Sequence, residues 1–88
     1  MFVIIKHTSD GKCSVIPEIF RTIEEGDAYL SYLQTKDLKL DWTVAISRMS
    51  HEISFYPPKS KCFSHEYILQ ELTFGDTINV TGKTVWKS

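Results

Sequence analysis

The sequence predicts an α+β fold: a two-layer sandwich in which two helices cover one face of a mainly antiparallel sheet of about 4–6 strands. Short segments rich in β-branched and aromatic residues predict the strands. Two other segments carry apolar residues at helical spacing. The connections are short, and 88 residues fit one domain. We therefore expect residues 1–88 to form a single α+β domain.

The N-terminal segment predicts two strands joined by a turn. Residues 2–6 form a short apolar run that is typical of a buried strand. Residues 9–12 contain Gly11, which can adopt the positive φ of a tight turn. A second strand follows at residues 13–16. This strand is at an edge of the sheet or ends at Pro17, because proline lacks the backbone donor that a ladder needs.

A capping box predicts the start of the first helix. The Thr22 hydroxyl can accept from the Glu25 amide, while the Glu25 carboxylate reaches back to the helix start. Negative charge near this end, which includes Asp27, suits the helix dipole. Gly26 weakens the helix by about 1 kcal/mol relative to Ala without preventing it. The apolar stripe, which continues to about Thr35, consists of Ile23, Tyr29 or Leu30, and Leu33.

The middle of the chain predicts a hairpin. Residues 42–48 and residues 53–56 both alternate between apolar and polar side chains, and residues 49–52 suit a reversal between them. The apolar residues on one face of the first strand are Trp42, Val44 and Ile46. Pro57 and Pro58 end the second strand.

A second, shorter helix is predicted next, followed by two strands. Ser64 is a good N-cap, and Gly75 suits the position just after the helix end. The apolar stripe of this helix would be Tyr67, Ile68, Leu69 and Leu72. Residues 77–80 and 84–86 then predict short strands on either side of Gly82.

The predicted order of elements is ββαββαββ. Its middle six elements resemble the ferredoxin-like order, with an additional terminal strand. This resemblance concerns only the order of the elements and involves no sequence motif. Because that fold carries many unrelated functions, no function follows from it.

Charge and glycine spacing exclude several function classes. Ten Lys and Arg residues against eleven Asp and Glu residues give a formal net charge of −1. There is therefore no overall field that would attract nucleic acid or mimic DNA, although a local patch of either sign is compatible with the sequence. The four glycines are too far apart for a phosphate-binding loop, and we expect no cofactor.

The sequence predicts a cytoplasmic protein without membrane contact. The first six residues lack the features of a secretory signal, and no stretch approaches the ~20 apolar residues of a membrane helix. In a reducing compartment the two cysteines would stay free. Lys outnumbers Arg eight to two and Ala occurs only twice, a bias typical of AT-rich genomes such as those of many phages.

Four residues have side chains that could bind zinc: His7, Cys13, Cys62 and His65. Their spacing matches no zinc signature, so we favour cysteines in the core and histidines at the surface, and predict no metal site. The three histidines could also support acid–base chemistry, as in RNA cleavage by a histidine pair. Nothing in their spacing selects that chemistry. We predict no catalytic residue and a protein that is not an enzyme.

Two segments mix cations with aromatic residues and supply the candidate binding site. The candidate residues are Tyr56, Lys59, Lys61, Phe63, Lys83, Trp86 and Lys87. They could bind RNA or single-stranded DNA, with Lys on phosphates and aromatic rings stacked on bases. They could equally anchor a partner protein, since Tyr and Trp are enriched at interfaces. The net charge of −1 and the presence of only two Arg favour a solvated loop whose aromatic residues fold back into the core over nucleic-acid binding. Those aromatic residues are Phe55, Phe63 and Trp86. The balanced charge also favours a protein partner over nucleic acid.

The leading functional hypothesis is a non-enzymatic regulator or inhibitor that binds a partner protein through aromatic anchors and an exposed sheet edge. A phage or mobile element would be a reasonable source, with a host protein as the target. The alternative is an RNA- or single-stranded-nucleic-acid-binding domain that uses the basic and aromatic residues. A homodimer is also compatible with the sequence, because a chain this small gains core by pairing.

Overall fold

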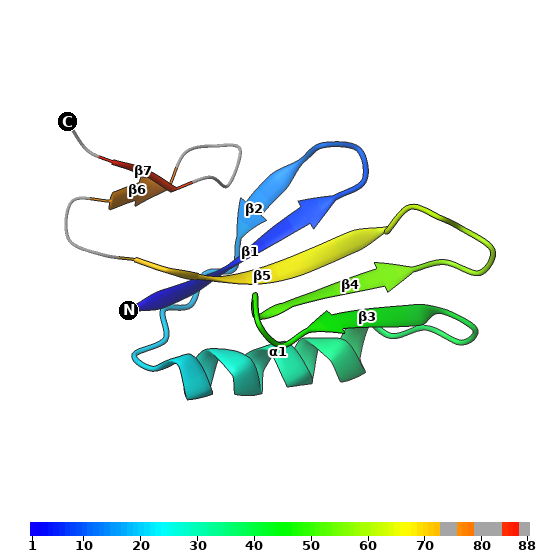
Figure 1. Cartoon of the computed structure of the whole chain (residues 1–88), viewed down its shortest axis with the longest axis horizontal. Helices are drawn as coiled ribbons and strands as arrows, with labels where there is room; N and C mark the ends of the chain where they lie inside the picture. Colours follow the sequence, from blue (N-terminus) through cyan, green and yellow to red (C-terminus); the bar gives the residue numbers. More distant parts are fainter. Residues whose placement is uncertain (73–75, 79–83, 87–88) are drawn as a thin grey trace.

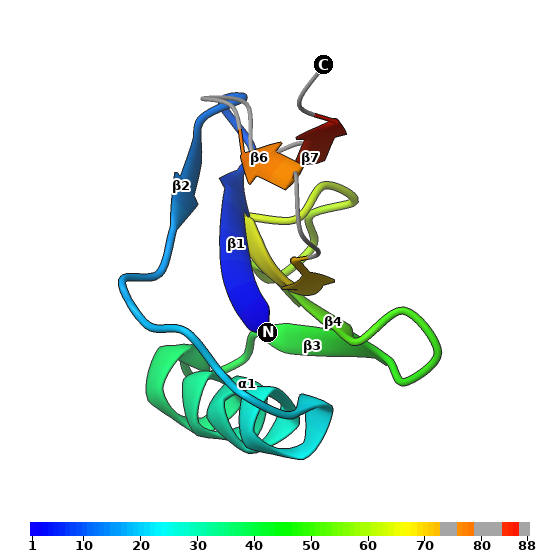
Figure 2. The same ribbon diagram turned by 90° about the vertical axis from the view of Figure 1, so that its left-hand side faces the viewer.

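The computed structural model describes residues 1–72, 76–78 and 84–86. In chain order its elements are β1 (Phe2–Thr8), β2 (Cys13–Val15), α1 (Ile23–Asp37), β3 (Thr43–Ser47), β4 (Glu52–Tyr56), β5 (His65–Glu71), β6 (Asp76–Ile78) and β7 (Thr84–Trp86). Figure 1 shows β1 to β5 side by side, with α1 along one face. Figure 2, turned by 90°, shows α1 beneath the sheet, so that helix and sheet form two layers.

The five strands β1 to β5 form one antiparallel sheet in the order β2-β1-β5-β4-β3. The central strand is β5, which pairs with β1 on one side and with β4 on the other. The two edges are β2 and β3, and α1 connects them in the chain by crossing one face of the sheet. This crossing brings α1 alongside the β3 edge.

The main core lies between α1 and the sheet. Strand alternation and pairing put Ile4, Leu69, Tyr67 and Ile53 on one face, since directly paired residues share a face. Leu30 and Leu33 of α1 pack against that face. Among the described residues, the buried cluster consists of Ile4, Phe20, Leu30, Leu33, Ile53, Phe55, Tyr67 and Leu69. This core holds α1 in a fixed position relative to β3 and β4.

The predicted second helix is wrong, and with it the order ββαββαββ and the ferredoxin-like resemblance. Residues 65–71 form β5, and the described chain has one helix beside a five-stranded antiparallel sheet. Tyr67 and Leu69 are buried toward α1, while Ile68 lies on the other face between them. Three consecutive apolar residues suit a central strand as well as a helix. Backbone pairing with both β1 and β4 decides the matter in favour of the strand.

The first helix is present and starts with the predicted cap. The Glu25 amide donates to Thr22 Oγ1 at 3.2 Å. The Glu25 carboxylate accepts from the Arg21 amide at 3.1 Å, one residue earlier than the capping box predicts. The helix continues to Asp37, two residues beyond the expected end.

Gly26 has a packing role that the sequence does not reveal. It is buried in the face of α1 that meets the sheet. A β-carbon at this position would lie 2.5 Å from Leu69 Cδ1 and 2.7 Å from Leu69 Cδ2. The absence of a side chain therefore allows α1 to approach β5 closely.

The two predicted C-terminal strands are present as β6 and β7. They pair with each other, Asp76 opposite Trp86, in a separate two-stranded sheet. The strand β6 begins one residue before the predicted range 77–80, whose last two residues lie outside the described part of the chain, as does Gly82. No helix of the described residues is long and apolar enough to span a membrane.

Candidate functional site

A groove runs between α1 and the β3–β4 hairpin. Its volume is about 390 Å³. The lining residues are Asp27, Leu30, Ser31 and Gln34 of α1, and Ile46, Ser47, Arg48, His51, Glu52 and Ile53 of the hairpin. The four helical residues recur at intervals of three or four, so they share one side of α1. The groove is therefore bounded by one helix face and one edge of the sheet.

The base of this groove is apolar. Leu30 and Ile53 are 5% and 4% exposed and belong to the core. Ile46 lies opposite Ile53 on β3 and is 50% exposed. Half of an isoleucine side chain is thus left uncovered at the place where the sheet ends, which favours contact with an apolar side chain from a second molecule.

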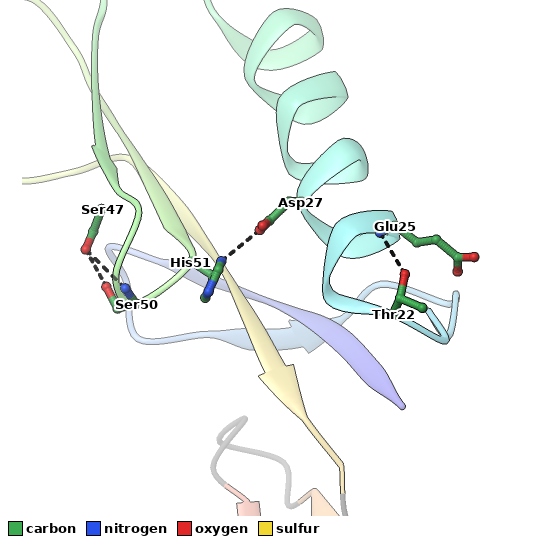
Figure 3. A network of polar contacts seen from close by, with 6 residues as sticks. All are labelled: Thr22, Glu25, Asp27, Ser47, Ser50 and His51. Carbon is green, nitrogen blue, oxygen red and sulfur yellow. Dashed lines mark hydrogen bonds and ion pairs between the residues drawn. The ribbon is translucent and has the colours of Figure 1, made fainter.

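Two of the lining residues, Asp27 and His51, contact each other across the groove, and Figure 3 shows this contact between α1 and the β3–β4 turn. His51 Nδ1 lies 2.9 Å from Asp27 Oδ1. The His51 backbone has a φ of 51°, in the left-handed region, and its carbonyl accepts from the Leu69 amide at 2.9 Å. These contacts attach the β3–β4 turn both to α1 and to the central strand.

The turn itself is stabilised by two serines. Ser50 Oγ donates to Ser47 Oγ at 2.5 Å, and the Ser50 amide donates to the same oxygen at 3.4 Å (Figure 3).

Asp27 holds the imidazole of His51 through Nδ1, as the carboxylate of a hydrolytic triad does. Within residues 1–72, however, no hydroxyl or thiol hydrogen-bonds to that imidazole. The geometry therefore does not assemble a nucleophile–base pair here.

The edge strand β3 has an unpaired side. Among the described residues, β4 is the only strand that hydrogen-bonds to β3. The N–H and C=O groups of every second residue of β3 thus point away from the sheet. Its sequence, Thr-Val-Ala-Ile-Ser, contains neither charge nor proline, the features that commonly protect an exposed edge.

Exposed apolar residues border this edge along its length. Leu38 and Leu40 precede β3 and are 43% and 89% exposed. Ile46 lies within the strand, and Met49, in the turn that follows, is 97% exposed. Together with the free backbone groups, these side chains can accommodate an additional strand.

A second polar cluster, at the other end of α1, has a structural role. Asp37 Oδ2 accepts from Tyr67 Oη and lies 3.0 Å from His65 Nε2. His65 also stacks on Phe55, with ring centroids 4.6 Å apart. Burial, followed by the hydrogen bond to Asp37, raises the pKa of Tyr67 well above its ordinary value. This cluster joins the last turn of α1 to β5.

The structure brings two of the four possible zinc ligands together and does not join the other two to them. His7 Nδ1 and Cys13 Sγ lie 3.5 Å apart on paired positions of β1 and β2. His65 faces α1, whereas His7 alternates onto the opposite face of the sheet. Cys62 is exposed, and neither cysteine forms a disulfide. Within the described residues, no group of three or more His, Cys, Asp and Glu side chains could hold a metal ion.

The four sequence-derived binding residues whose side chains the structure describes lie away from the groove. Tyr56 ends β4, and Lys59 and Lys61 are exposed in the β4–β5 loop with the half-buried Phe63. This loop is at the opposite end of β4 from the β3–β4 turn (Figure 1). Lys83 and Lys87 lie outside the described residues, as does the side chain of Trp86. Binding through these seven residues stays a prediction.

No protein-family model, no curated protein sequence and no solved structure matches this chain significantly. Sequence reasoning anticipated an exposed sheet edge without identifying the strand, and it assigned Asp27 to the helix dipole. The helical spacing of residues 27, 30, 31 and 34 was visible in the sequence, but the side of the helix that would meet β3 was not.

Proposed function

We propose that this chain is a non-enzymatic regulator that captures an extended segment of a partner protein as a sixth strand beside β3. The observation that carries the proposal is the position of an uncharged, unpaired edge strand next to a groove lined by α1. In such strand addition, main-chain hydrogen bonds supply affinity, and a pocket for alternate side chains supplies specificity.

Both parts of this recognition, the free backbone groups and the pocket for side chains, are present on the same edge. The outward backbone groups of β3 can pair with any extended chain, whatever its sequence. Side chains of the added strand that lie opposite Val44 and Ile46 would share the α1 side of the sheet, since directly paired residues share a face. The side chain opposite Ile46 would therefore enter the groove, which Ile46 lines and Val44 does not, and the intervening side chains would point to the other face.

A selection with displayed random peptides on the immobilised whole chain tests this proposal. We expect enriched peptides to bind the wild type and to lose binding to Ile46→Lys, which places a charge at the base of the groove. Ala45→Lys is the matched control, because Ala45 is exposed on the same strand but faces away from α1. Circular dichroism confirms that both variants fold.

Three results would contradict the proposal. Enriched peptides that bind Ile46→Lys as tightly as wild type would place the contact elsewhere. A selection without enrichment would exclude strand addition by short segments. A dimer in sedimentation, dissociated by Ile46→Lys and not by Ala45→Lys, would show that β3 pairs with a second copy of this chain instead of a partner segment.

A further inference from the structure

We infer that the groove selects a segment with an aliphatic residue opposite Ile46 and an acidic residue opposite Arg48, added antiparallel to β3. This inference rests on the proposed strand addition and specifies the chemistry of the partner. Three observations support it: the apolar base of the groove, the position of Arg48 on its rim, and the direction of every strand pair in the sheet.

The aliphatic position follows from the shape and lining of the groove. A residue opposite Ile46 would place its side chain over Leu30, Ile46 and Ile53, with Ser31 and Gln34 of α1 at the sides. A volume of about 390 Å³ lies at the small end of ligand pockets, and it suits one large side chain together with parts of its neighbours. Burial of that side chain would also cover the exposed half of Ile46.

The acidic position follows from the charges on the rim. Arg48 is exposed, lines the groove and forms none of the ion pairs of the described residues. Asp27 already contacts His51. Glu52 also lines the groove, but it alternates with Ile53, which directs its side chain away from α1. A carboxylate opposite Arg48 would therefore meet a cation that neither Asp27 nor Glu52 holds in an ion pair.

The order of the two residues follows from strand direction. All pairs in the sheet are antiparallel, and the antiparallel ladder is slightly more stable per residue than the parallel one. Arg48 directly follows the last residue of β3, Ser47, so the added strand would extend one residue beyond β3 to lie opposite it. With antiparallel addition, that partner residue precedes the one opposite Ile46 by two positions. A further apolar residue two positions later would lie opposite Val44. The expected pattern is acidic, any residue, aliphatic, any residue, apolar.

A capped peptide, Thr-Glu-Thr-Leu-Thr-Val-Thr, provides the direct test. Its affinity for the labelled whole chain is measured by NMR titration against peptides with Leu→Thr, with Glu→Lys, and with the reversed order. We expect Leu→Thr to weaken binding about tenfold or more, as loss of a buried aliphatic side chain does. Glu→Lys should weaken it roughly two- to fivefold, which corresponds to an exposed ion pair. The reversed peptide should bind more weakly than the parent.

Charge exchange tests the Arg48 contact specifically. In Arg48→Glu we expect the preference to invert, so that the Lys peptide binds more tightly than the Glu peptide. Arg21→Glu is the control, since Arg21 is exposed and precedes α1, away from the groove, and this variant should keep the preference for Glu. Equal affinity of the Glu and Lys peptides for wild type and for Arg48→Glu would overturn the acidic position. Tighter binding of the reversed peptide would overturn the direction.

Backbone methylation separates this inference from the proposed function. In strand addition, N-methylation of a peptide residue whose N–H group faces β3 abolishes binding of the peptide. N-methylation of the residues between them has little effect. If that alternation is found while Leu→Thr and Glu→Lys have no effect, strand addition stands and the inferred side-chain selection is wrong. If methylation has no alternating effect, or if none of the peptides binds, both are wrong.

Discussion

The Asp27 carboxylate and the His51 imidazole meet at 2.9 Å, although the two residues are 24 positions apart in the sequence. The contact joins α1 to the β3–β4 turn across the groove (Figure 3). Both side chains remain partly exposed, 45% for Asp27 and 32% for His51. Exposed pairs of this kind contribute little to stability. The pair therefore positions the turn more than it stabilises the fold.

A double-mutant cycle with Asp27→Asn and His51→Gln measures this pair. We expect a coupling free energy of about 0.2–1 kcal/mol in urea unfolding, because water competes for both side chains. The same variants should weaken the binding of a groove peptide, since this part of the groove is no longer fixed. A coupling free energy above about 2 kcal/mol would show instead that the pair contributes strongly to the stability of the fold.

His51 also occupies a strained backbone position. Its φ of 51° lies in the left-handed region, which glycine adopts far more readily than other residues. We expect His51→Gly to be about 1 kcal/mol more stable to urea than His51→Ala, although both variants lose the contact with Asp27. Equal stability of the two variants would mean that the turn relaxes to another conformation when the imidazole is removed.

Gly26→Ala is expected to destabilise the fold, in spite of the higher helix propensity of alanine. The new methyl group would lie 2.5 Å from Leu69 Cδ1, so the Leu69 side chain or α1 would have to move. Overpacking costs about 1–3 kcal/mol, whereas the propensity gain is about 1 kcal/mol. Thermal unfolding should therefore show a lower midpoint for Gly26→Ala than for wild type.

The background Leu69→Val provides the control for that prediction. Valine lacks the two Cδ atoms that the added methyl group would meet. In this background, Gly26→Ala should leave the midpoint of thermal unfolding unchanged or raise it, whereas it should lower the midpoint in wild type. The same destabilisation in both backgrounds would mean that something other than the Leu69 contact requires glycine at this position.

Tyr67 makes stability depend on pH in alkaline solution. Burial and the hydrogen bond to Asp37 raise the pKa of Tyr67 in the folded protein. A raised folded-state pKa gives stability that is complete below the unfolded pKa of about 10 and is lost as the pH rises above it. The free energy of unfolding of wild type should therefore decrease above about pH 10 relative to Tyr67→Phe. Parallel pH profiles of the two proteins would contradict this.

Local signals in the sequence predicted α1 and the strands of the β3–β4 hairpin, but they misassigned β5. Thr22 and Glu25 act within one turn, and the alternation around Val44 is likewise local. By contrast, Tyr67, Ile68 and Leu69 suit a helix or a buried strand equally well. Their pairing with β4 and with β1, which lies more than sixty positions earlier in the chain, fixes the choice.

The groove was not predictable for a related reason. Asp27 has a sufficient local explanation in the helix dipole, and Ile46 has one in the alternation of its strand. That both line one groove depends on α1 crossing from β2 to β3, which is a property of the strand order. A single sequence contains the periodicity of each element but not the order in which the strands pair.

Hydrogen exchange of the β3 amides, followed by NMR on the whole chain with and without a saturating selected peptide, tests strand addition most directly. In the free protein, the amides of Thr43–Ser47 that point away from β4 should exchange fast, and peptide binding should slow them at least about tenfold. Ile46→Lys should show no such slowing at the same peptide concentration, and Ala45→Lys should behave as wild type does. Slowing confined to the β4–β5 loop, or unchanged exchange along β3 when peptide is bound, would show that the edge strand is not the binding site.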